Sequence, residues 1–305
     1  MRPKNGIRAL TAALLIMVLS SAPLMARPSP AQEPPAGEAA AGRAGEAEKK
    51  PGLKQAARDF AADTGRIWSA PFRIKDRDVA PLIALAATTT FLIAADEDIL
   101  AGVKSYADAH GWVHDVGSTV TQLGGLGAFA TAGIFYGAGI IFKDERARDT
   151  GFLAASAMVQ SFLVSHALKG FTGRQRPNYG DGADHWAGPV GFFQRYEKAN
   201  EGLYDSFPSG HAATAFSLAT VVALQYRHQT WVPILAYTIA AGVSVSRVTE
   251  DRHWMSDIVV GAVLGHLIAR LVVRNHNKRQ RLVPVLGCTG RSVTFGFHYV
   301  LGPAY

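Results

Sequence analysis

The sequence SFPSGHAATAFSLATVVALQY, residues 206–226, contains no charged side chain. It begins with a Pro-Ser-Gly turn and continues as one apolar run, and about 20 such residues span a bilayer as a helix. The exposed backbone N–H groups and the dipole at the start of a helix favour an anion. This stretch therefore predicts a membrane-spanning helix whose first turn can bind an anionic group.

Five further segments have the same apolar character: residues 79–95, 116–142, 150–168, 229–246 and 254–273. The last of them contains Asp257 and Arg270. It can span a membrane if Arg270 extends to the interface and Asp257 lies in a polar cavity. The predicted fold class is an all-α, six-helix transmembrane bundle over residues 79–273, and the alternative is a soluble bundle of very apolar helices.

The composition agrees with a membrane protein. Hydrophobic residues make up 48% of the 305 residues and charged residues only 18%, against about 25% charged residues in ordinary soluble domains. The net charge of +7 is modest, and no basic stripe with interleaved aromatic residues is present, so no nucleic-acid partner is expected. The single cysteine, Cys288, excludes an internal disulfide framework and a cysteine-based zinc site.

The two ends of the chain differ from the predicted bundle. Residues 1–26 have the positive start and apolar run of a secretory signal peptide, with an uncleaved anchor helix as the alternative. Residues 27–51, rich in Pro, Ala, Gly and Glu, predict a disordered linker. Residues 52–78 predict an interfacial helix or a plain solvated one. The tail, residues 274–305, contains a basic segment, and its sequence pattern is compatible with a short β-hairpin after it, with a turn at residues 287–290.

Three polar clusters lie at the ends of the apolar segments. In the first, Lys169 is followed after six residues by Arg176 and Pro177. Two cations beside a membrane helix commonly act as an interfacial anchor, and Arg174 between them fits either an anchor or an anion site. In the second, Gly210 permits close approach of a ligand to the backbone. Ser209 adds a hydroxyl donor there, although a plain helix N-cap also fits this turn.

The second and third clusters also contain groups suited to acid–base and covalent chemistry. His211, at the start of the predicted helix, is placed to protonate a leaving oxygen. His253 and Asp257 are four residues apart, so on a helix they share one face. A carboxylate there can keep one imidazole nitrogen protonated and leave the other free as a nucleophile. Arg247 supplies a forked, permanently charged donor for phosphate, while a purely structural His–Asp pair is the alternative.

Together, Lys-x6-Arg-Pro, Pro-Ser-Gly-His and Ser-Arg-x5-His-x3-Asp resemble the signature of the type 2 phosphatidic acid phosphatase family, in the same order. Its superfamily includes bacterial acid phosphatases and vanadium haloperoxidases. The resemblance implies that His253 is a nucleophile that forms a phosphohistidine, with Asp257 as its orienting carboxylate. It implies that His211 is the acid for the leaving alcohol. The phosphate-binding residues that it implies are Lys169, Arg176, Ser209, Gly210 and Arg247.

The resemblance implies a phosphatase that needs no metal ion and no other cofactor, because three cations take the place of metal ions. The substrate expected is a phosphomonoester or diphosphate on a membrane lipid, so the partners are the membrane and a lipid phosphate. The alternatives are a soluble secreted acid phosphatase of the same superfamily, a vanadate-dependent haloperoxidase, and a flippase-like or structural membrane protein with an idle site.

The topology signals conflict. The loops at residues 143–148, 226–229 and 274–281 carry many cations, and the positive-inside rule puts them in the cytoplasm and the three clusters on the periplasmic face. A cleaved signal instead puts residue 27 in the periplasm, and six crossings then bring the clusters to the cytoplasm. We expect a multi-pass protein of the bacterial inner membrane with its site facing the periplasm.

Overall fold

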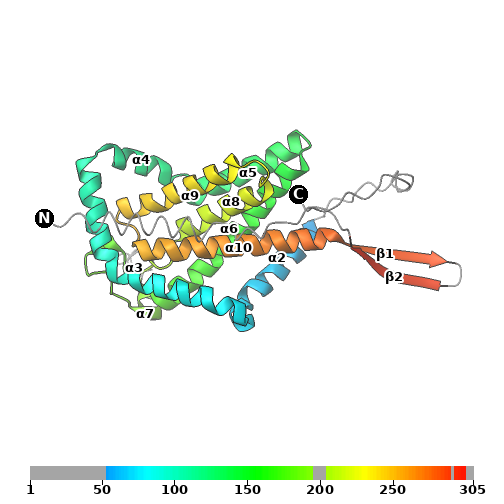
Figure 1. Cartoon of the computed structure of the whole chain (residues 1–305), viewed down its shortest axis with the longest axis horizontal. Coiled ribbons are helices and arrows are strands. Elements are labelled where there is room, and N and C mark those ends of the chain that lie inside the picture. The colour runs from blue at the N-terminus through cyan, green and yellow to red at the C-terminus, as the bar shows by residue number, and fades with distance from the viewer. Residues whose placement is uncertain (1–52, 195–203, 290–291, 300–305) are drawn as a thin grey trace.

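The computed structural model describes residues 53–194, 204–289 and 292–299. The predicted signal peptide (1–26) and linker (27–51) lie outside the described residues. The described chain is a helical bundle followed by one β-hairpin (Figure 1). Its α-helices are α2 (Leu53–Trp68), α3 (Asp76–Ala109), α4 (Trp112–Thr121), α5 (Gly125–Ile141), α6 (Glu145–Thr172), α7 (Gly188–Gln194), α8 (Gly210–Gln225), α9 (Trp231–Thr249) and α10 (Met255–Arg281).

All six apolar segments are helical, as the all-α prediction requires. Helices α3, α6, α9 and α10 are each long and apolar enough to cross a membrane, and the pair α4 and α5, bent by 53°, adds a fifth candidate span. The remaining segment, α8, has 16 residues. At 1.5 Å per residue its length is about 24 Å, short of the roughly 30 Å hydrocarbon core. The bundle therefore has six helical segments, of which four or five have the dimensions of a membrane span.

Helix α8 is the centre of the bundle. It packs against α6, α9 and α10, and more lightly against α5, and Figure 1 shows it running among these helices. Phe216 of α8 packs with Ile258 of α10 in one hydrophobic cluster, and Val221 packs with Met158 and Ile268 in a second. Helix α8 is thus held in place by its neighbouring helices.

Two glycines of α10 set its close approach to α8. A Cβ added at Gly261 would lie 2.4 Å from the backbone oxygen of Ser209, and one at Gly265 would lie 2.1 Å from that of Ala213. No real side chain fits at such distances, so only glycine lets the two backbones touch, as small residues do in membrane helix pairs. This contact fixes the start of α10 beside the start of α8.

The segments that flank the bundle are also ordered. Residues 52–78, predicted as an interfacial helix, contain α2 and a 3-10 helix, η1 (Ala70–Arg73). Helix α2 is attached to α10, because Asp63 accepts hydrogen bonds from Asn275 and from both terminal nitrogens of Arg279. Trp68, Phe72 and Ile74 stay exposed, which suits contact with a membrane surface.

A β-hairpin follows directly on α10. Strands β1 (Leu282–Thr289) and β2 (Ser292–Tyr299) pair antiparallel, with Thr289 opposite Ser292. The predicted turn at residues 287–290 is therefore misplaced, because residues 287–289 belong to β1. Residues 290 and 291 lie outside the described residues. The alternation of residue types in the sequence located the second strand.

Substituting Gly265→Ala should lower the thermal unfolding temperature of the detergent-purified protein. The new Cβ forces α10 away from the backbone of α8, and overpacking of this kind costs about 1–3 kcal/mol. The matched control is Gly133→Ala in α5, where an added Cβ has no neighbour within 4 Å. Alanine favours a helix over glycine, so the control should keep or raise the unfolding temperature. Equal effects of the two variants would contradict the proposed packing role.

Candidate active site

The three predicted clusters meet at one end of the bundle. Lys169 lies in the last turn of α6, His211 in the first turn of α8, Arg247 near the end of α9, and His253 between α9 and α10. Arg247, Lys169 and Arg176 all act electrostatically on the His211 ring, and the last two also act on His253. The structure therefore brings the residues of separate motifs into one site.

The first cluster is positioned by the end of α6. Gly173 ends this helix in the left-handed conformation, with φ of 50°. A Cβ there would lie 2.1 Å from the oxygen of Gly188, so both the conformation and the space require glycine. The chain then turns back, and Lys169 and Arg176 both bind Asp205. Lys169 Nζ donates to the Asp205 backbone oxygen, and Arg176 Nε donates to the Asp205 carboxylate at 2.6 Å.

The second cluster forms the N-terminus of α8. Ser209 is the N-cap residue, and its hydroxyl accepts a hydrogen bond from Ala212 N at 3.4 Å. Its backbone N–H donates to the backbone oxygen of Asp257 at 3.0 Å, and this hydrogen bond connects α8 to α10. A Cβ added at Gly210 would meet nothing within 4 Å, so open space adjoins this helix start. The phosphate-binding roles of Ser209 and Gly210 stay predictions.

His211 lies against the sharp turn between α4 and α5. The position of a Cβ on Gly125 is 3.2 Å from His211 Nε2, and that of a Cβ on Gly124 is 3.0 Å from His211 Cδ2. Gly125 also has a positive φ of 44°. These glycines leave room for the imidazole ring, so the 53° bend between α4 and α5 forms one wall of the site.

The third cluster places His253 beside Asp257, but not on a shared helical face. His253 precedes α10, and its Nδ1 lies 3.5 Å from Asp257 Oδ2, at the limit of hydrogen bonding. The same oxygen accepts from Trp254 N at 2.9 Å, as an acidic residue in a first helical turn does. The predicted pairing is thus present, while the predicted reason is wrong, because the chain before α10 is not helical.

Burial keeps His253 neutral. Its side chain is 2% exposed, and this desolvation lowers its pKa to about 3 from an ordinary 6.5, against the opposing effect of Asp257. The positive charges of Arg176 and Lys169 lower the pKa further. A neutral imidazole retains the lone pair that a nucleophile needs.

A fully buried arginine holds the carboxylate that adjoins His253. Arg174 Nη1 donates to Asp257 Oδ1 at 2.7 Å, and Arg174 Nη2 donates to Asp96 Oδ2 at 2.9 Å. Ser256 Oγ links the same groups, since it accepts from Arg174 and donates to Asp96 at 2.5 Å. Asp257 Oδ2 accepts from Ser206 at 2.5 Å. Every oxygen of Asp257 is therefore fixed before a ligand enters.

Aromatic rings enclose this arginine. The Arg174 guanidinium carbon lies 4.7 Å from the centre of the Trp186 ring and 5.4 Å from that of Trp254, distances at which cation–π attraction operates. Trp254 Nε1 donates to the backbone oxygen of Gln175 at 2.9 Å. Arg174 therefore belongs to the support of the site and not to an interfacial anchor.

Arg247 completes the set of cations. Its Nη1 donates to Thr121 at the end of α4 (2.8 Å) and to Glu250 (2.5 Å). Its Nε is buried and makes no hydrogen bond to any described residue. Ser246, the serine of the third motif, donates to Thr121 Oγ1 at 3.1 Å. The Ser246–Arg247 pair thus connects α9 to α4.

Sequence reasoning missed several residues of the site: Asp96, Thr121, Asp205, Ser206 and Ser256. The sequence did indicate Asp96, because an ionisable residue beside an apolar helical segment needs an oppositely charged or hydrogen-bonding partner. The others are short polar residues without a distinctive pattern, and only the folded chain brings them to the site.

Comparison with known proteins agrees with these motifs. Residues 150–281 match the model of the PAP2 superfamily. Over these residues, which are less than half of the chain, the protein is similar to this family. The match covers α6, α8, α9 and α10, which supply most residues of the site.

Three curated proteins are similar in sequence to parts of this chain. Phosphatidylglycerophosphatase B of Bacillus subtilis is 27% identical over 199 residues, which are 63% of this chain and 88% of that protein. Lipid A 1-phosphatase of Porphyromonas gingivalis is 43% identical over 68 residues, 22% of this chain and 15% of that protein. The probable diacylglycerol pyrophosphate phosphatase 1 of Schizosaccharomyces pombe is 37% identical over 90 residues, 26% of this chain and 32% of that protein.

One solved structure is similar over a comparable range. It is the crystal structure of a transmembrane PAP2 type phosphatidylglycerolphosphate phosphatase from Bacillus subtilis. The two chains share 24% identity and a TM-score of 0.45, over 64% of this chain and 96% of the other.

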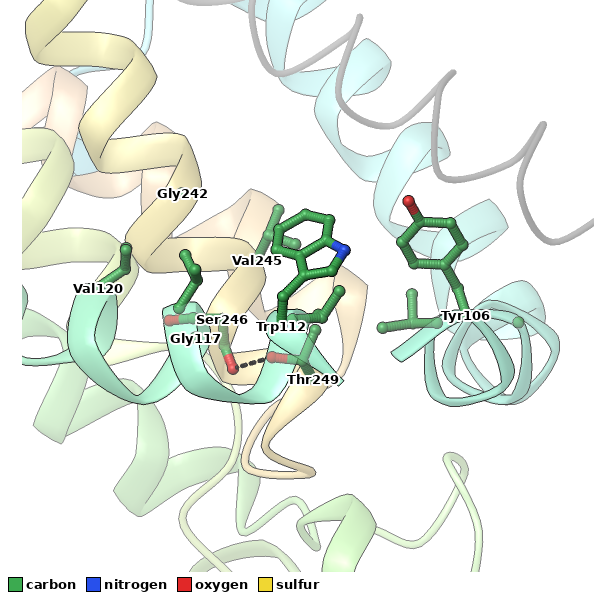
Figure 2. Close-up of a pocket in the computed structure, with 12 residues that line it drawn as sticks. Tyr106, Trp112, Gly117, Val120, Gly242, Val245, Ser246 and Thr249 are labelled. Atoms are coloured by element: carbon green, nitrogen blue, oxygen red, sulfur yellow. Dashed lines mark hydrogen bonds between the residues drawn. The ribbon is translucent and has the colours of Figure 1, made fainter. Parts of the chain in front are cut away.

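An apolar pocket of about 390 Å³ adjoins the candidate site. Figure 2 shows it between α4, the end of α9 and the end of α3, with the rings of Tyr106 and Trp112 at one side. Ser246 and Thr249 line it, so its wall includes the neighbour of Arg247. Its volume lies in the range of roughly 300–1,000 Å³ found for small-molecule sites.

Substituting Arg174→Ala should strongly destabilise the protein and abolish any phosphatase turnover. The change leaves Asp96 and Asp257 buried without their cation, and removing one partner of a buried ion pair costs about 3–5 kcal/mol. Thermal unfolding in detergent and phosphate release would be measured together. Arg252→Ala, at an exposed position, is the control and should leave both unchanged. Wild-type stability of Arg174→Ala would contradict the supporting role.

Proposed function

We propose that the chain hydrolyses a phosphomonoester or diphosphate on a membrane lipid through a phosphohistidine intermediate. The observation that carries the proposal is a buried, neutral His253 beside a fixed Asp257, with Lys169 and Arg176 close enough to act on its charge. A neutral nucleophile next to cations is suited to attack on an anionic phosphoryl group, because the cations stabilise the charge of its oxygens.

The first step forms the intermediate. The Nε2 lone pair of His253 forms a bond to phosphorus while the bond from phosphorus to the leaving oxygen breaks. Burial and the charges of the three cations lower the pKa of His211 to about 4 in the free protein, so His211 takes up its proton together with the anionic phosphate. It gives this proton to the leaving oxygen, and the lipid leaves as a neutral alcohol or, from a diphosphate, as a monophosphate. Asp257 lies 3.5 Å from His253 Nδ1 and stabilises the positive charge that develops on the ring.

The second step releases phosphate. His211, now lacking its proton, takes one from water as the water oxygen attacks phosphorus. The bond between His253 and phosphorus breaks, and inorganic phosphate leaves with both histidines restored. Lys169, Arg176 and Arg247, with the backbone N–H groups at the start of α8, would hold the phosphoryl oxygens throughout. This division of roles calls for no metal ion.

A lipid is the substrate class that the surroundings of the site favour. The site lies at the end of helices long and apolar enough to cross a membrane, and an apolar pocket adjoins it. All three curated relatives are named for phosphatases of lipid phosphates. A soluble acid phosphatase would not need such helices, so this alternative is the weaker one.

We also propose that the protein lies in a bacterial inner membrane with its site facing the periplasm. The site is formed by the ends of α6 and α9 and the starts of α8 and α10. The cationic segments 143–148, 226–229 and 274–281 lie at the opposite ends of these helices. The positive-inside rule places those segments in the cytoplasm, which supports a periplasmic site.

Phosphate release by the detergent-purified protein tests the proposal. We expect lipid phosphates to be hydrolysed in preference to a soluble aryl phosphate, with full activity in the presence of a metal chelator. His253→Ala should abolish release, since the variant lacks the imidazole that takes the phosphoryl group in the proposed mechanism. The matched control is His228→Ala, an exposed histidine between α8 and α9. Activity in His253→Ala would contradict the mechanism, and preference for the soluble ester would favour the acid phosphatase.

Filling the apolar pocket should separate lipid from soluble substrates. Val116→Trp places a large ring at the wall of the pocket. We expect the KM for a long-chain lipid phosphate to rise several-fold while the KM for a soluble aryl phosphate is unchanged. Ile134→Trp, on an exposed part of α5 away from the pocket lining, should change neither KM. Equal changes for both substrates would show that the pocket does not receive the lipid.

A further inference from the structure

The cations of the site already have a carboxylate between them. Arg176 Nε donates to Asp205 Oδ1 at 2.6 Å, and Lys169 Nζ lies 4.0 Å from Asp205 Oδ2 while it binds the backbone oxygen of the same residue. The Asp205 side chain is 17% exposed, and that of Lys169 is 5% exposed. Asp205 is thus part of the interior of the site and not a surface acid that happens to lie nearby.

Asp205 is charged at neutral pH. Burial works against its ionised form, but Lys169 and Arg176 outweigh this effect and hold its pKa below the ordinary value of 3.8. The charge of His253, when present, would act in the same direction. An anion therefore occupies a place beside the two residues that the family motif assigns to phosphate.

The third cation has an acidic partner as well. Arg247 Nη1 donates to Glu250 Oε2 at 2.5 Å. Within the residues that the structure describes, Asp205 and Glu250 are thus carboxylates that accompany the three cations of the site. Arg247 pairs with Glu250, three residues further along at the end of the same helix. Asp205 lies in a different segment from Lys169 and Arg176, and it contacts both of them. Asp205 is the acid positioned to compete with a bound phosphate.

We propose that Asp205 is a built-in counter-anion that limits the affinity of the site for phosphate and thereby promotes release of the inorganic phosphate product. A phosphate group that reaches Lys169 and Arg176 must share them with a fixed negative charge, and like charges side by side in a buried site weaken binding strongly. The effect on product release rests on the proposed function, whereas the effect on phosphate binding does not.

The isosteric variant Asp205→Asn tests this inference. Its side-chain oxygen can still accept from Arg176, but the negative charge is gone. Inorganic phosphate is the probe. We expect its inhibition constant, against hydrolysis of a soluble aryl phosphate, to fall roughly tenfold or more, with a fall in KM and no rise in kcat. Asp205→Glu keeps the charge and should stay close to the wild type.

A direct binding measurement separates this inference from the proposed function. Calorimetric titration of inorganic phosphate into full-length His253→Ala, with and without Asp205→Asn, needs no turnover. Tighter binding in the double variant supports the inference even if no substrate is hydrolysed. The control is Asp98→Asn, an exposed acid on α3, which should leave phosphate binding unchanged.

Two outcomes would overturn the inference. Unchanged phosphate binding in Asp205→Asn would show that the carboxylate moves aside without cost. Weaker binding would show that Asp205 accepts a hydrogen bond from a protonated phosphate oxygen and is a ligand of it. Thermal unfolding confirms that the variant is folded. If Asp205→Asn does not fold, the inhibition and calorimetric measurements are made on Asp205→Ser, which retains a hydroxyl oxygen.

Discussion

The site depends on one buried ionic contact, the guanidinium of Arg174 between the carboxylates of Asp96 and Asp257. All three side chains are shielded from solvent, so each charge is tolerated only because the others are present. The contact joins α3, the loop after α6, and α10, and it orients the carboxylate on which His253 depends. A fully buried residue thus determines how the carboxylate beside His253 is placed. This is why precise chemistry can be built at the ends of separate helices.

The electrostatic design of the site separates two tasks. Arg174 is neutralised by Asp96 and Asp257 and holds the structure of the site together. Lys169, Arg176 and Arg247 instead lie beside the start of α8. Their own acidic neighbours, Asp205 and Glu250, moderate the field. A cradle with unopposed cations would bind phosphate tightly and release it slowly. Partial neutralisation matches an enzyme that must discharge a doubly charged product after each cycle.

Much of the helical architecture and the central residues of the site were predictable from sequence. Apolar runs located the helical segments, and the spacing of His253, Asp257 and Arg247 identified the site, because these signals are local in the chain. Asp96 and Asp205 were not found, since their partners lie 78 and 29 residues away and no spacing rule links them. The prediction that His253 and Asp257 share one helical face was wrong because the start of α10 was placed too early. A helix start can be placed only within a few residues, and His253 falls just outside it.

The shortness of α8 has a consequence for how the protein enters the membrane. This helix of 16 residues follows the turn at Ser209 and packs mainly against other helices. Its polar groups, such as Ser217 and Thr220, are therefore satisfied by α6, α9 and α10. By itself, a helix of this length is too short to span the hydrocarbon core of a bilayer. Assembly of the catalytic end is therefore a late event in biogenesis, completed only when α10 has been synthesised and has closed against α8.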